Sequence, residues 1–61
     1  MEVTVATQIQ DGYVSIIGVW HSKEHSVQDI IKEITKEWLG DYGEEPEFGD
    51  HGIELHTSFV D

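Results

Sequence analysis

A chain of 61 residues makes one small domain at most, near the lower size at which a chain buries enough surface to fold unaided. The absence of cysteine excludes disulfides and cysteine-based zinc sites, and a net charge of −10, from 13 acids against three lysines, disfavours direct contact with nucleic acid or anionic membranes. The apolar and aromatic content is that of a globular chain, and without a signal peptide or an apolar run of roughly 20 residues we expect a soluble cytoplasmic protein.

The first predicted element is a β-hairpin. Residues 2–10 alternate between apolar and polar side chains, the period of a half-buried strand, and residues 13–20 form a second strand. Asp11 and Gly12 between them favour a type I′ turn, because both central residues of that turn need a positive φ. This turn implies the pairs Gln10–Tyr13, Ile9–Val14, Thr7–Ile16, Val5–Gly18 and Val3–Trp20.

The predicted register divides the hairpin into two faces. We expect the core face to gather the apolar residues of the first strand and their partners, namely Val3, Val5, Ile9, Val14, Ile16 and Trp20. The other face is more apolar than a solvated face should be. Its residues Tyr13, Ile17 and Val19 therefore form a candidate second interface.

A helix over residues 27–39 follows. Val27, Ile30, Ile31, Ile34 and Trp38 form one helical stripe. Ser26 is the expected N-cap, with Asp29 completing an approximate capping box, and Gly40 is a natural C′ residue after Leu39. An acidic loop over 40–52 leads to a third alternating strand over 53–60.

These elements give the order ββαβ over residues 1–61, a single small domain. The predicted class is α+β: a three-stranded, mainly antiparallel sheet with one helix packed on one face. Because the helix returns the chain between strands two and three, the third strand should run antiparallel to the first. We expect the first strand to be central.

The acidic loop "GDYGEEPEFGDHG" carries five carboxylates and no lysine or arginine. It fails the EF-hand calcium template at Gly43, Pro46 and Gly52, the third, sixth and twelfth positions counted from Asp41. A metal-binding acidic loop therefore stays a minor alternative, and we predict no cofactor and no specific metal site. The histidines are not expected to converge on a metal either; they are His21, His25, His51 and His56.

The sequence contains no recognisable catalytic motif. The serines Ser15, Ser22, Ser26 and Ser58 lack a nucleophile-elbow context, and one helix on three strands leaves little room for a pocket that excludes water. We predict that the chain is not an enzyme.

The acidic residues of the helix and loop form the predicted partner-binding surface. Asp29, Glu33 and Glu37 recur every four residues along the helix, where like charges cost stability. The ridge continues into Asp41, Glu44, Glu45, Glu47 and Asp50, with Tyr42 and Phe48 as aromatic anchors. The alternative for these two aromatic residues is that they pin the loop onto the domain.

A small, acidic, cysteine-free chain of this kind resembles phage-encoded inhibitors of host enzymes, some of which are DNA mimics. The resemblance implies an interaction protein that binds and blocks a basic, nucleic-acid-binding surface of a partner, since carboxylates can occupy arginine and lysine sites that otherwise hold phosphates. The charge has another explanation in solubility or adaptation to salt.

The alternative function is that of an antitoxin-like or regulatory subunit. The order of strand, "DGYV" hairpin, strand, serine-capped helix and strand resembles the partial RNase H-like fold of HicB-type antitoxins over most of the chain. The sequence lacks that family's glycine-rich sequence after the second strand and an attached DNA-binding segment. This resemblance implies association through a dimer or sheet interface and an acidity that neutralises a basic toxin; the chain itself is expected as a monomer or homodimer.

Overall fold

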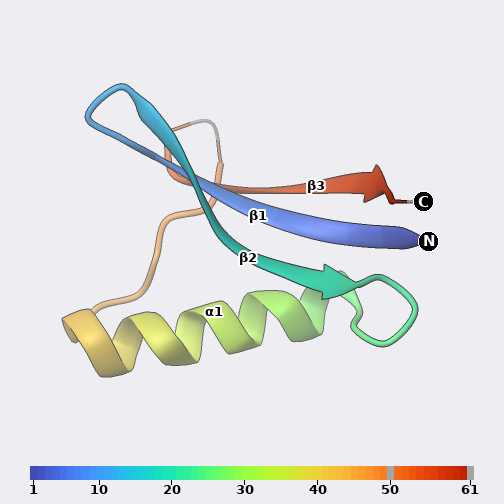
Figure 1. The fold of residues 1–61 in the computed structure, drawn as a ribbon. Coiled ribbons are helices and arrows are strands. Elements are labelled where there is room, and N and C mark those ends of the chain that lie inside the picture. Colours follow the sequence, from blue (N-terminus) through green and yellow to red (C-terminus); the bar gives the residue numbers. More distant parts are fainter. Residues whose placement is uncertain (50, 61) are drawn as a thin grey trace.

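The structure, a computed structural model, describes residues 1–49 and 51–60. Its elements are β1 (Glu2–Gln10), β2 (Tyr13–His21), α1 (Val27–Tyr42) and β3 (Ile53–Phe59), and Figure 1 shows α1 lying along one face of the sheet. The strand order is β2-β1-β3, and both pairs are antiparallel. The predicted α+β class, ββαβ order and central first strand are confirmed.

The hairpin turn forms as predicted, but the register changes along it. Asp11 and Gly12 have φ values of 51° and 82°, and the pairing from Gln10–Tyr13 to Thr7–Ile16 follows the prediction. A β-bulge between Ala6 and Thr7 then leaves Ile17 as an extra residue of β2. Because one extra residue moves the rest of the strand by one position, the predicted pairs Val5–Gly18 and Val3–Trp20 are wrong. The observed pairs are Val5–Val19, Thr4–Trp20 and Val3–His21.

The helix covers the opposite face of β1 from the one we expected. Ala6 is fully buried with Ile30, Ile34 and Ile53, and the half-buried residues packed against them are Ile17, Trp20, Trp38 and Leu55. Of the predicted core-face residues Trp20 packs against this cluster and Val3 is buried outside it, while Val14 and Ile16 are 68% and 69% exposed. The small side chain of Ala6 leaves room for the two helix isoleucines, and the flanking strands supply the bulk that fills the layer.

The helix begins as predicted and ends later. The backbone N–H of Asp29 donates to Ser26 Oγ at 3.2 Å, which confirms the N-cap. The predicted end at Leu39 is wrong, because the helix continues to Tyr42 and Gly43 is its left-handed terminal residue, with φ 72° and its N–H donating to Leu39 O. The connecting loop therefore covers residues 43–52 rather than 40–52.

The second half of this loop is held by backbone hydrogen bonds. The N–H of Ile53 donates to Glu47 O at 2.9 Å, and that of Gly49 donates to Ile53 O at 3.0 Å. A Cβ on Gly52 would lie 2.3 Å from Glu47 O, so this turn requires glycine at position 52. β3 then ends at Phe59, one residue before the predicted end. Among the described residues no helix is long and apolar enough to cross a bilayer.

Candidate interaction surface

The acidic residues of the helix lie on the exposed side of α1 that turns toward β2. Trp20 Nε1 donates to Glu33 Oε2 at 3.0 Å, which fixes the orientation of this side. Glu33, Glu37 and Asp41 line one open hollow together with Lys36. Asp29 is exposed in the first turn of the helix. The helix thus presents a row of carboxylates with Lys36 beside it.

The acidic residues of the loop gather at a second place. Glu44, Glu45 and Glu47 are exposed and line a hollow of about 260 Å³. Its other walls come from the end of β1, the helix and the start of β3, namely Gln8, Ile9, Trp38, Pro46, His51, Gly52 and Ile53. This hollow and the helix hollow share none of their lining residues. The predicted acidic surface is therefore two groups of carboxylates, one on α1 and one on the loop, with Asp29 apart in the first turn of the helix; Asp50 lies outside the described residues.

The two predicted anchor residues differ in their surroundings. Tyr42 packs against Trp38 with ring centroids 5.2 Å apart and keeps 65% of its surface exposed. Phe48 forms a parallel bridge to Ile53 and is 40% exposed. The Tyr42–Trp38 contact joins two residues of α1, and the Phe48 bridge is a backbone contact between the loop and the first residue of β3. The two interpretations of these side chains, partner anchors or pins for the loop, therefore both stay predictions.

The three residues of the predicted second interface do not share a face. Ile17, the bulge residue, packs against the core on the side of the helix. Val19 pairs with Val5 on the opposite face, and Tyr13 lies beside the hairpin turn, where it is 76% exposed. The bulge is the reason, since it breaks the alternation on which the grouping depended.

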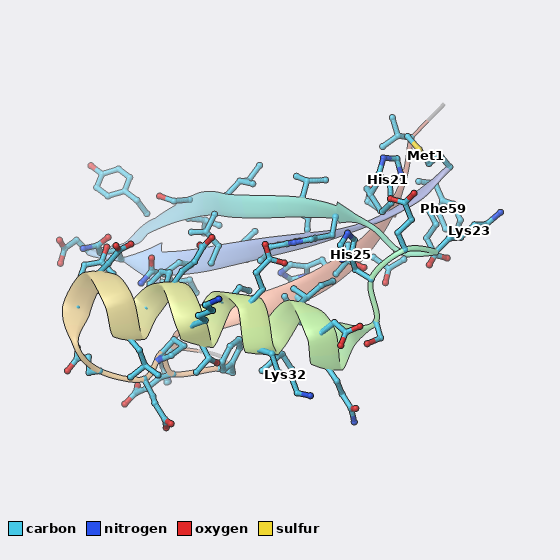
Figure 2. All side chains as sticks on the ribbon, turned by 90° about the horizontal axis from the view of Figure 1, so that it is seen from below. Met1, His21, Lys23, His25, Lys32 and Phe59 are labelled. Carbon is cyan, nitrogen blue, oxygen red and sulfur yellow. The ribbon has the colours of Figure 1, made fainter. Side chains whose placement is uncertain are left out.

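Charge is segregated along the molecule. Figure 2 shows Lys23, His21 and His25 together at one end and Lys32 on the outer side of the helix. No lysine or arginine follows Lys36 in the sequence, so the loop at the opposite end carries carboxylates and His51 but no lysine or arginine. Within the described part of the chain no lysine forms a salt bridge, and the one close contact between an acidic and a basic side chain joins Glu54 Oε2 to His56 Nε2 at 3.4 Å, an ion pair when the imidazole is protonated.

A hydroxyl, an imidazole and a carboxylate do meet on the sheet. Thr7 Oγ1 lies 3.2 Å from His56 Nε2, and Glu54 Oε2 lies 3.4 Å from the same nitrogen. A nucleophile–base–orienter relay needs the hydroxyl and the carboxylate on different ring nitrogens. This exposed trio is therefore not arranged as a catalytic triad. Among the residues described, no group of three or more histidine, aspartate or glutamate side chains is placed to hold a metal ion.

Sequence reasoning missed several residues of these surfaces. Trp38 packs against the core, as its place in the apolar helix stripe predicts, and it also lines the loop hollow, which the stripe does not predict. Gln8 and His51 reach the same hollow from elements far apart in the sequence, and no local pattern signals that meeting. Val14 and Ile16 were assigned to the core, and they are exposed apolar residues. Comparison of the chain with protein-family models, curated proteins and solved structures finds no match.

Proposed function

We propose that this chain is a small acidic interaction protein that binds and blocks a basic, nucleic-acid-binding surface of a partner protein. The supporting observation is that exposed carboxylates surround the helix C-terminus and line the loop without lysine partners in the described residues. Carboxylates that are not neutralised within the molecule are available to pair with arginine and lysine of another protein, and their field speeds association.

The loop is suited to this role because its backbone is ordered by its own hydrogen bonds. The bonds between Glu47, Gly49 and Ile53 hold the second half of the loop without a partner. Groups that are already in position lose less conformational freedom on binding, which favours affinity. The hollow between Glu44, Glu45 and Trp38 offers carboxylates and an aromatic ring to a cationic side chain.

The experiment is affinity capture from cell lysate with mass spectrometry, followed by binding measurements on the recovered protein. The variant Glu44→Gln, Glu45→Gln, Glu47→Gln should weaken the complex roughly tenfold or more, since several charged contacts are removed together. A matched control neutralises Asp11, Glu2 and Glu24 (to Asn, Gln and Gln), which are exposed and lie outside the loop hollow. Both variants have the same net charge.

Binding should also fall as salt rises, and duplex DNA should compete for the partner. Equal binding by the two charge variants would contradict a specific acidic site and leave solubility as the reason for the charge. A captured protein that DNA does not displace would contradict the blocking of a nucleic-acid surface.

A second candidate, an antitoxin-like or regulatory subunit that associates through its sheet, is favoured by one observation. The face of the sheet that α1 leaves uncovered exposes Val14, Ile16 and Val19. Loss of capture on Ile16→Asp, with retention in the loop variant, would support this candidate over the first.

A further inference from the structure

The uncovered face of the sheet, here called the open face, is an apolar surface. The register places six apolar side chains on it, from Val3, Val5, Ile9, Val14, Ile16 and Val19, and of these Val3 is buried. Val14, Ile16 and Val19 are 58–69% exposed, and in Figure 1 the helix α1 lies on the other side of the sheet. Contiguous exposed apolar surface of this kind marks an interface in a folded protein.

The open face is also nearly free of charge. Its one carboxylate in the described residues is that of Glu54, which pairs with His56 on the edge strand β3. The remaining polar positions are Thr7, His21 and Ser58. Although the chain has a net charge of −10, this face is complementary to a neutral, apolar surface rather than to a basic one.

We propose that the open face packs against the same face of a second copy, giving a two-fold symmetric dimer with the sheets face to face. Three strands of seven to nine residues make a face of roughly 14 by 23–30 Å at ordinary strand spacing and rise. Two such faces amount to roughly 640–840 Å² before the relief of the side chains is counted, somewhat below the bound of about 1,000 Å² for a stable specific interface. The dimer is therefore expected to be weak, roughly micromolar.

Electrostatics favours this arrangement over others for so acidic a chain. In a face-to-face dimer the two sheets form the inner layers and the two helices the outer ones, roughly 30 Å apart at about 10 Å per layer. That separation exceeds the Debye length of about 8 Å, so the repulsion between the helix carboxylates is screened.

Pairing through the edge of β2 is less favourable. β2 is an edge strand, but its bulge at Ile17 lies in the middle of the strand. A bulge twists an edge and interrupts the regular row of hydrogen-bonding groups that a second strand needs.

Sedimentation equilibrium from about 10 μM to 1 mM tests the dimer. The mass should rise from 6.9 kDa toward twice that value. Ile16→Lys should weaken association roughly tenfold or more. The control Leu39→Lys adds the same charge at a 46% exposed leucine on α1 and should leave association unchanged. Circular dichroism shows whether each variant is folded. If Ile16→Lys does not fold, the double variant Val14→Thr, Val19→Thr replaces it, because it removes apolar surface from the open face at nearly constant volume and should also weaken association.

A wild-type mass of 6.9 kDa at about 1 mM would overturn the dimer and assign the open face to a different partner. Equal weakening by the two lysine variants, or dilution-dependent NMR shifts confined to the backbone edge of β2, would overturn it as well. Added salt should maintain or strengthen the dimer, because it screens repulsion and favours apolar burial. Salt weakens a complex with a basic partner, so the dimer and the proposed blocking function fail separately.

Discussion

The sign of the stability change at Gly40 tests where α1 ends. Gly40 lies within the helix, and a Cβ added there meets no atom within 4 Å. Alanine at this position should raise the free energy of unfolding by about 0.5–1 kcal/mol, because glycine loses more backbone entropy than alanine in a helix. Gly43 also leaves space for a Cβ but has φ of 72°, so alanine there should lower the free energy of unfolding by about 1–2 kcal/mol.

Urea denaturation monitored by circular dichroism measures both changes. A chain of this size has a total stability of roughly 3–9 kcal/mol, so shifts of this magnitude are readily resolved. With an m value of about 1 kcal/mol/M, the midpoint should rise by about 0.5–1 M for Gly40→Ala and fall by about 1–2 M for Gly43→Ala. The variants are compared at one protein concentration, because self-association adds to apparent stability. A destabilising Gly40→Ala with a neutral Gly43→Ala would refute the boundary and return the helix end to Leu39.

Three further substitutions test the loop, the core and the cap. Gly52→Ala should lower the free energy of unfolding by about 1–3 kcal/mol, because its Cβ would lie 2.3 Å from Glu47 O; unchanged amide-exchange protection of Ile53 would contradict the turn. Ile30→Ala should cost about 2–5 kcal/mol, since this side chain is fully buried; calorimetry showing a loss below about 1 kcal/mol would place Ile30 outside the core. Ser26→Ala should cost about 1 kcal/mol in urea denaturation, while Ser26→Asp keeps a capping oxygen and most of the stability; equal losses would argue against the cap.

The candidate surfaces were only partly predictable. The sequence shows that acids cluster after Glu33, because charge is a property of composition and order alone. It does not show that Gln8, Trp38 and the loop glutamates meet at one hollow, since that depends on how β1, α1 and the loop pack together. The grouping of Tyr13, Ile17 and Val19 was wrong because the bulge at Ile17 could not be read from alternation.

Local chemistry determined the elements and their order. Asp11–Gly12 turns the hairpin, Ser26 starts the helix, and the spacing of Ile30, Ile34 and Trp38 gives that helix one apolar stripe; each effect acts over a few residues. Tertiary structure alone decided which face of the sheet is buried. Both faces carry apolar side chains, so alternation does not specify the register by itself.

The choice between the faces follows from volume. Ala6 leaves space for Ile30 and Ile34, and its neighbours Ile53 and Leu55 from β3, with Trp20 from β2, close the layer around them. This packing requires large and small side chains from four elements to fit together, and only the assembled fold brings them into contact.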